Sequence, residues 1–229
     1  MIGLIGAMEM EISGLVACME QTQTESVSGI LFYIGTIEGM PCVVAKCGAG
    51  KVNAAISAQA MIDRFQPEAL INIGAAGAVA PGLSLYDLVI SEDVVQHDMD
   101  VTGLGYAPGI VPDQEESFFK ADPGLIVLAD QAGSAEGLKT HMGRMASGDL
   151  FVSEEGQRQR IHDTFHALCA EMEGAAIAQA CWRNRVPFVI LRSISDNADG
   201  NAGVSYAEFS EKAAGQAVRL LSRMLKTWS

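Results

Sequence analysis

The chain has 229 residues, of which 49 % are hydrophobic and 19 % are charged, a composition typical of a compact globular protein with a large core. Its formal net charge of −13 at pH 7 argues against binding to nucleic acid or to an anionic membrane surface, because both attract positive charge. No apolar stretch approaches the length of a membrane span. These features favour a protein without nucleic-acid or membrane partners.

The first residues lead directly into an apolar strand pattern without a basic and apolar leader, so we expect a cytoplasmic location. The cysteines are widely spaced and form no Cys-x-x-Cys pair: Cys18, Cys42, Cys47, Cys169 and Cys181. We expect all five to be reduced. Those in apolar stretches are expected to pack as small hydrophobic side chains.

Short strands and longer helices are predicted to alternate along the chain. Strand-like apolar runs occupy residues 2–7, 42–46, 69–73, 87–91, 166–170 and 187–193, and helical spacing occupies residues 10–20, 51–65, 124–133, 174–184 and 207–228. This alternation predicts a single domain over residues 1–229, with an α/β layered fold and a mostly parallel, buried sheet. Residues 96–122, rich in Gly, Pro and acidic residues, are predicted to form a loop that serves the site or a partner.

Three acidic residues, Glu11, Glu173 and Asp196, each follow one of the strand-like runs. Ligands of open α/β sheets bind at the carboxyl ends of the strands. The three carboxylates are therefore predicted to meet at one edge of the sheet, in an acidic catalytic site. For Glu9 and Glu171 we prefer a structural role, since acidic residues are favoured at helix N-termini.

Other motifs have plainer interpretations. Residues 48–51 lack the flanking residues of a P-loop, and Asn53 stands where a dinucleotide fingerprint has its third glycine, so a tight strand-to-helix turn is predicted. The small residues 74–78 suit close approach of a planar ligand. Residues 97–100 include His and Asp but lack metal-ligand spacing, and no metal is expected. Residues 192–196 are equally consistent with an ion pair plus a helix cap and with a catalytic site.

Six segments together resemble the bacterial 5′-methylthioadenosine/S-adenosylhomocysteine nucleosidases of the nucleoside phosphorylase/hydrolase superfamily. They are IGAMEME (5–11), CGAGKVNAA (47–55), HDMDVT (97–102), SGDLF (147–151), EMEGAA (171–176) and RSISD (192–196). The resemblance implies a three-layer fold with a mixed central sheet flanked by helices, a homodimer, and no cofactor. It also implies hydrolysis of the N-glycosidic bond of methylthioadenosine, S-adenosylhomocysteine and 5′-deoxyadenosine, in methionine salvage and removal of methyl-cycle by-products.

The resemblance assigns catalytic roles to particular residues of this chain. Cleavage develops positive charge on the sugar, and neutral adenine leaves only when its ring is protonated, so an acid and a base are required. The resemblance implies that Asp196, beside Ser195, protonates adenine N7, and that Glu11 activates water. Glu173 would hold the ribose hydroxyls and stabilise the cationic sugar. Arg192 would orient the water and the glutamates.

The resemblance also implies the surroundings of the substrate. Phe151 would stack on adenine, the backbone of Val152 would bond its edge, and Gly77 would lie against it. Met172 would pack under the ribose. The pocket for the 5′-substituent would comprise Met8, Ala49, Val101, Phe151, Met172 and Tyr206, with Leu104 and Pro112 from the other subunit.

Four positions depart from the family pattern. Ala75 stands in the site where familiar members have a serine whose hydroxyl helps to position the acid or a nearby water. Ala49 replaces a bulkier aliphatic residue, and Leu104 and Tyr206 often correspond to phenylalanine. The departures predict a wider and slightly more polar pocket, which affects substrate preference more than the type of reaction.

Three alternatives remain open from the sequence. A phosphorolytic enzyme of the same superfamily would need donors or cations where Glu11 stands, so an acid there favours water as the nucleophile. A hydrolase of 6-amino-6-deoxyfutalosine in menaquinone synthesis would use the same chemistry on a different 5′-substituent. A non-catalytic nucleoside-binding protein would have no need for an acid and a base together.

Overall fold

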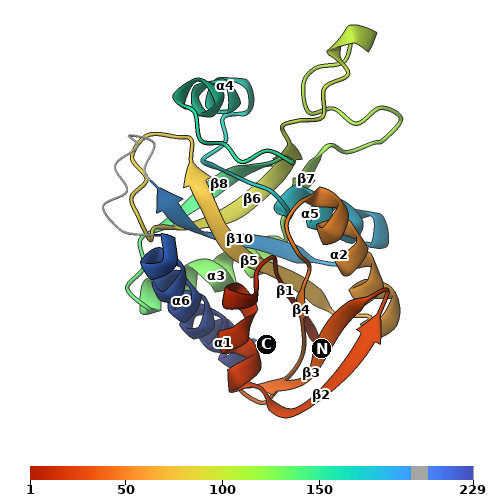
Figure 1. The fold of residues 1–229 in the computed structure, drawn as a ribbon, viewed down its shortest axis with the longest axis vertical. Helices are drawn as coiled ribbons and strands as arrows, with labels where there is room; N and C mark the ends of the chain where they lie inside the picture. Colours follow the sequence, from red (N-terminus) through yellow and green to blue (C-terminus); the bar gives the residue numbers. More distant parts are fainter. Residues whose placement is uncertain (197–205, 229) are drawn as a thin grey trace.

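The structure, a computed structural model, describes residues 1–196 and 206–228, without the side chains of Asp196, Tyr206 and Ala207. Ten strands form one mixed sheet with helices packed against it (Figure 1). The strands are β1 (Ile2–Gly6), β2 (Glu20–Val27), β3 (Ile30–Ile37), β4 (Met40–Lys46), β5 (Ala69–Ala78), β6 (Leu88–Gln96), β7 (Phe118–Lys120), β8 (Thr140–Ser147), β9 (Cys169–Glu171) and β10 (Phe188–Asp196). The helices are α1 (Glu9–Cys18), α2 (Lys51–Phe65), α3 (Pro123–Ala135), α4 (Glu155–Phe165), α5 (Gly174–Asn184) and α6 (Tyr206–Lys226), with a short 3₁₀ helix at Thr102–Leu104.

Parallel pairing of the central strands determines where the site lies. The strand order is β10-β6-β8-β9-β5-β1-β4-β3-β2, and β10 also pairs with β5. Strand β1 lies between β4 and β5, parallel to both, and β10 runs parallel to β5. The carboxyl ends of these four strands therefore meet at one edge. There Gly6 is opposite Lys46 and Ile73, and Arg192 is opposite Gly74.

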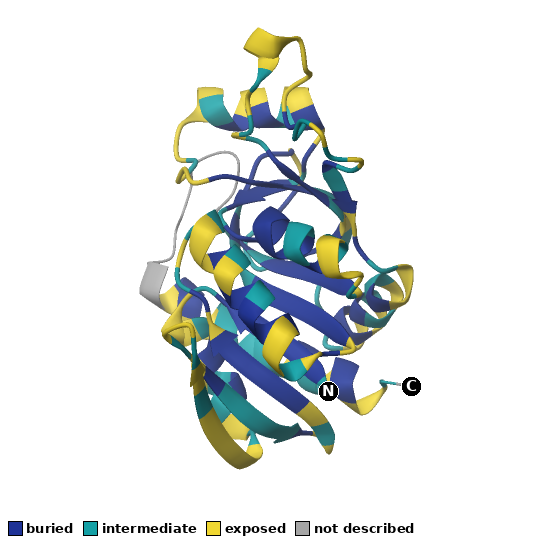
Figure 2. Ribbon diagram, turned by 90° about the vertical axis from the view of Figure 1, so that its right-hand side faces the viewer, coloured by how far each residue is buried: buried dark blue, intermediate teal, exposed yellow. Residues whose placement is uncertain are grey.

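The core is built from the apolar strand runs and the faces of the helices that cover them. All five residues of β1 are buried, as are the apolar residues of β4, β5 and β10 between their ends, apart from the half-buried Ala75. Helix α6 contacts both α1 and α3, and α2 packs against α5 (Figure 1). Figure 2 shows the central strands as a buried band, while the segment around the 3₁₀ helix is exposed. None of the helices within residues 1–196 and 206–228 is both long and apolar enough to cross a membrane.

The predicted helices and the mixed sheet of the α/β fold are confirmed, with helix boundaries shifted by up to two residues. Three regions were missed: the β2–β3 hairpin, β8 and α4. Strand β2 is almost entirely polar and exposed, and α4 carries few apolar residues, so neither gives a clear periodic pattern. The predicted loop 96–122 also contains β7 and the 3₁₀ helix, and residues 121–122 lead into α3.

Candidate active site

Glu11 lies on the first turn of α1, directly after β1. Its Oε2 accepts hydrogen bonds from the backbone N–H groups of Ala7, at 2.6 Å, and Met8, at 2.9 Å. Its Oε1 lies beside Gly74 of β5, so close that a Cβ added there would be 2.9 Å away. One carboxylate oxygen is thus held by the backbone, while the other points across the sheet edge. Glu9, by contrast, forms an exposed ion pair with Lys46, at 2.9 Å, in keeping with a structural role.

Glu173 lies at the N-terminus of α5 and is 7 % exposed. Its Oε1 accepts a hydrogen bond from the backbone N–H of Gly50, at 2.9 Å. Gly50 belongs to the turn between β4 and α2 that the sequence predicted, and its φ of 93° favours glycine. The turn therefore has a second function that the sequence did not reveal, since its backbone fixes the carboxylate of Glu173.

The side chain of Arg192, on β10, lies between the acidic residues at the sheet edge and pairs with two of them. Its guanidinium is 1 % exposed, and its Nη2 contacts the carboxylate of Glu171 and donates to Oδ1 of Asn72, at 2.6 Å. The Oε2 of Glu173 lies 3.9 Å from the same nitrogen. Asn72 was not singled out from the sequence. The feature that could have identified it is an amide side chain inside the otherwise apolar run of β5. Its Nδ2 donates to the carbonyl of Ile5, at 2.8 Å.

The environment gives each ionisable group a different affinity for protons. Burial, and then the negative charge of Glu171, raises the pKa of Glu173 to about 7, against the opposing effects of Arg192 and the N–H of Gly50. Burial would also raise the pKa of Glu171, but Arg192, Ser147 and two backbone N–H groups hold it below its ordinary value. The thiol of Cys47 stays neutral, because burial and then Glu173 raise its pKa to about 12.

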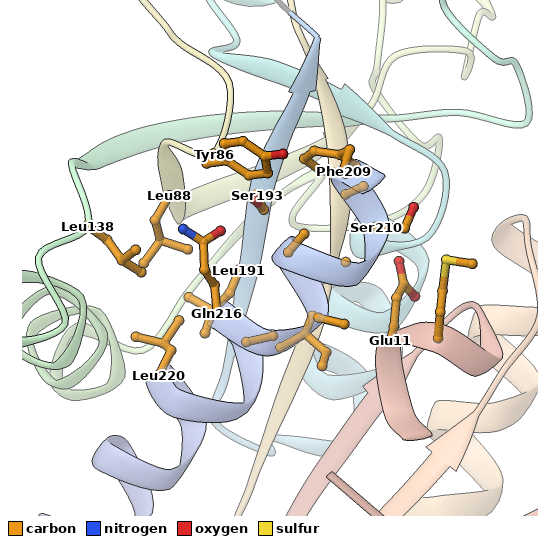
Figure 3. Close-up of a pocket in the computed structure, with 17 residues that line it drawn as sticks. Glu11, Tyr86, Leu88, Leu138, Leu191, Ser193, Phe209, Ser210, Gln216 and Leu220 are labelled. Atoms are coloured by element: carbon orange, nitrogen blue, oxygen red, sulfur yellow. The ribbon is translucent and has the colours of Figure 1, made fainter. Parts of the chain in front are cut away.

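A largely apolar pocket lies beneath the first turns of α6, with Glu11 at one end (Figure 3). Its cavity of about 40 Å³ has room for water, which needs roughly 10–15 Å³. Two buried polar atoms that line it, Oγ of Ser193 and Oε1 of Gln216, have no hydrogen-bond partner among the described residues. The other walls include Gly74, Ala75, Tyr86, Leu191, Phe209 and Ala213.

The register of β10 against β5 brings further predicted site residues to the same edge. Asp196 is the last residue of β10, and its backbone lies opposite Gly77. The side chain of Asp196 lies outside the described residues, as does that of Tyr206. The hydroxyl of Ser195 donates to the carbonyl of Ala76, at 3.2 Å. Ala75 is opposite Ser193.

The remaining predicted residues lie around this cluster or project from it. Met172 is half-buried between Glu171 and Glu173, and Met8 is the N-cap residue of α1 and is 38 % exposed. Ala49 is exposed in the turn before α2, and Val152 is half-buried between β8 and α4. Phe151 and Leu104 are 77 % and 75 % exposed. Val101, Leu104 and Pro112 belong to the segment that extends from the sheet, away from β1 and α1 (Figure 1).

The described residues contain no group of three or more His, Cys, Asp and Glu side chains that could hold a metal ion. The acidic residues near His97 have other partners. Asp98 pairs with Lys51, at 2.6 Å, and Asp100 accepts hydrogen bonds from the hydroxyl and the backbone of Thr102.

Comparisons with known proteins agree on one family. The sequence profile of the Phosphorylase superfamily matches residues 1–226. The chain is 42 % identical over 224 residues to the 5′-methylthioadenosine/S-adenosylhomocysteine nucleosidase of Geobacillus thermodenitrificans, covering 97 % of this chain and 94 % of that protein. The nucleosidase of the same name from Neisseria meningitidis, solved with methylthio-immucillin-A, superimposes with a TM-score of 0.92 at 38 % identity, over 99 % of this chain and 98 % of that one. For the Campylobacter jejuni nucleosidase the TM-score is 0.94 at 32 % identity, over 98 % of both chains.

Replacing Arg192 with methionine tests the electrostatics of the cluster. Arg192→Met leaves Glu171 buried without its counter-charge, so the free energy of unfolding in urea should fall by about 3–5 kcal/mol. Arg64→Met is the matched control, because Arg64 pairs with Glu25 at the exposed surface, where such pairs contribute little. Equal losses in the two variants would contradict the importance assigned to the buried pair.

Proposed function

The chain belongs to the phosphorylase superfamily and to its 5′-methylthioadenosine/S-adenosylhomocysteine nucleosidases, and on this basis we propose that Glu11, Glu173 and Asp196 carry out its reaction. The protein is an N-glycosyl hydrolase that converts these nucleosides to adenine and the 5′-substituted ribose. The placement of Glu11 is the observation that carries the proposal. Its Oε2 is fixed by two N–H groups, and its Oε1 faces the sheet edge beside a cavity large enough for water.

Glu11 is the general base in this proposal. A base must have one oxygen free to receive a proton, and it must be held in place while it does so. The hydrogen bonds from Ala7 and Met8 fix the carboxylate, and Gly74 leaves space for it, since a Cβ there would lie 2.9 Å from Oε1 and 3.3 Å from Nη1 of Arg192. A water beside Oε1 would lose its proton to Glu11 as it attacks the sugar.

The leaving group is adenine, and Asp196 is its proton donor. Adenine leaves as a neutral base when N7 accepts this proton, which lowers the energy of the transition state. The backbone of Asp196 lies opposite Gly77, whose lack of a side chain allows a flat ring to approach β5. Ser195 precedes Asp196 on the same strand. Phe151 stacks on adenine, and the backbone of Val152 forms a hydrogen bond with the edge of the ring.

Glu173 holds the ribose hydroxyls above Met172. With a pKa of about 7, Glu173 is partly protonated at neutral pH and gains negative charge as the pH rises through that value. The ionised form stabilises positive charge on the sugar in the transition state. The acidic limb of the pH–rate profile should therefore lie near neutrality.

Hydrolysis is favoured over phosphorolysis by the charge around the nucleophile. Glu11, Glu171 and Glu173 surround one guanidinium, and that guanidinium already contacts Glu171 and Asn72. A phosphate ion would meet net negative charge with no unpaired cation in this cluster to receive it. Neutral water has no such penalty.

The protein functions as a cytoplasmic homodimer in this proposal, with residues 1–229 as a single catalytic domain and no cofactor. Helix α2 presents two apolar side chains one turn apart, Val52 and Ile56, which are 68 % and 47 % exposed. They border a groove between α2 and α5 that also contains Ala176 and Ala180. In this proposal the face is buried against a second copy, and Leu104 and Pro112 of one subunit complete the 5′ pocket that Met8, Ala49, Val101 and Tyr206 line in the other.

Substitution of Glu11 tests the base directly. Glu11→Gln keeps the size of the side chain but removes its basicity, so turnover of methylthioadenosine should fall about 10²–10⁴-fold. Glu9→Gln, two residues away on the same helix and exposed, should retain wild-type turnover. Asp196→Asn should lose activity to a similar extent, and both losses should leave the melting temperature close to that of the wild type. Near wild-type release of adenine by Glu11→Gln or by Asp196→Asn would refute the role of that residue.

A charged substitution on α2 tests the dimer. Ile56→Arg places a cation on the proposed interface, so sedimentation should show a monomer, and KM for methylthioadenosine should rise by roughly tenfold or more as pocket contacts are lost. Val127→Arg is the control, because Val127 is similarly exposed, at 54 %, on α3. A monomeric Ile56→Arg variant with unchanged KM would contradict a shared pocket, and an unchanged dimer would contradict the choice of face.

A further inference from the structure

Glu171 is the most completely engaged carboxylate among the described residues, although the sequence suggested no direct role for it. Its Oε1 accepts from the hydroxyl of Ser147, and its Oε2 contacts Nη2 of Arg192. The same Oε2 accepts from the backbone N–H groups of Glu173, at 3.0 Å, and Gly174, at 2.7 Å. Only 1 % of the side chain is exposed, so it has no contact with bulk solvent and cannot itself meet the substrate.

These contacts join three separate elements at one point. Ser147 ends β8, Arg192 lies on β10, and Glu173 and Gly174 form the start of α5. The hydroxyl of Ser147 also accepts the backbone N–H of Ala175, at 2.7 Å. The first backbone groups of α5, which no helical partner satisfies, are therefore held by Glu171 and Ser147. The orientation of Glu173 depends on both.

We propose that Glu171 is a positioning residue of the nucleosidase site, which fixes Arg192 and the first turn of α5 and so keeps the carboxylate of Glu173 available to the ribose. The proposal rests on the function given above. Its physical basis is competition for one guanidinium. Nη2 of Arg192 is in contact with Glu171 and lies 3.9 Å from Glu173. The guanidinium therefore interacts more strongly with Glu171 than with Glu173.

Without Glu171, Arg192 would be drawn to Glu173. Two buried charges of opposite sign attract strongly at short range, and among the described residues no carboxylate other than Glu171 and Glu173 forms an ion pair with that guanidinium. A direct ion pair would occupy the oxygen that the substrate hydroxyls need. Glu171 thus acts through Arg192 and through the backbone rather than on the substrate.

The same arrangement affects the proton affinity of Glu173. The ionisable groups that face Glu173 are Glu171 from β9, Arg192 from β10, Glu11 from α1 and Cys47 from the turn after β4. Burial and the charge of Glu171 raise the pKa of Glu173 to about 7. Removal of the negative charge at 171 would relieve the repulsion and also free Arg192 for Glu173. Both effects lower the pKa of Glu173.

The test compares Glu171→Gln with Glu171→Asp, and uses Glu9→Gln as a control that removes one exposed carboxylate near the site. The first readout is the titration of Glu173 by infrared or ¹³C NMR spectroscopy, assigned as the carboxyl signal that disappears in Glu173→Gln. In Glu171→Gln the midpoint should fall from about 7 by roughly one pH unit or more, as is typical when a carboxylate gains a cationic partner. Glu9→Gln should leave it unchanged.

The second readout is the kinetics of adenine release. Glu171→Gln should lower kcat by roughly tenfold or more and should move the acidic limb of the pH–rate profile in the same direction as the titration. Glu171→Asp keeps the negative charge but shortens the side chain by one methylene group. We therefore expect kcat to fall, while the titration midpoint of Glu173 moves much less than in Glu171→Gln. If Glu171→Gln does not fold, the Asp variant decides alone, because unchanged kcat in a folded Glu171→Asp protein would overturn the proposal.

An unchanged midpoint in folded Glu171→Gln, or a lower rate without any shift of the acidic limb, would also overturn it, since a purely structural defect would reduce activity at every pH. The titration needs no turnover. Failure of the wild type to release adenine would therefore refute the proposed function, while failure of the midpoint to move would refute only the role of Glu171.

Discussion

The buried guanidinium of Arg192 is the interaction on which the rest of the site depends. A charge removed from water costs several kcal/mol unless it is paired and hydrogen-bonded. Arg192 is paired through Nη1 and Nη2 with groups from β9, β5 and β10 itself: Glu171, Asn72 and the carbonyl of Leu191. Its position brings together the ends of strands that are far apart in sequence. The helix that starts at Glu173 and the turn at Gly50 are then fixed relative to it.

Three glutamates of the same chemical type acquire different properties from this arrangement. Glu11 has one oxygen held by two N–H groups and lies at the sheet edge, which suits a base. Glu173 is buried, lies farther from the cation and has a raised pKa, which suits contact with hydroxyls and with a developing positive charge. Glu171 contacts the cation and stays ionised, and it has no access to a ligand. Differences in distance and burial, rather than residue type, separate their roles.

Much of this could be predicted from the sequence because the informative elements are strongly periodic. The runs of β1, β5 and β10 and the spacing of α2, α5 and α6 identified an α/β sheet, and Glu11, Glu173 and Asp196 were expected at one edge of it. The polar strand β2 and the polar helix α4 were missed, since they bury little apolar surface. The contacts of Gly50 and Asn72 were also missed, because they join residues more than one hundred positions apart. Asp196 and Tyr206 stay predictions as side chains of the site.

The source of the oxygen in the sugar product tests the central claim most directly, because the account assigns the attack to a water beside Glu11. Methylthioadenosine would be incubated with the protein in H₂¹⁸O with excess inorganic phosphate, and the products identified by mass spectrometry. The account predicts adenine and free methylthioribose that carries ¹⁸O at C1, at the same rate with and without phosphate. An unlabelled sugar 1-phosphate, or a rate that depends on phosphate, would contradict it.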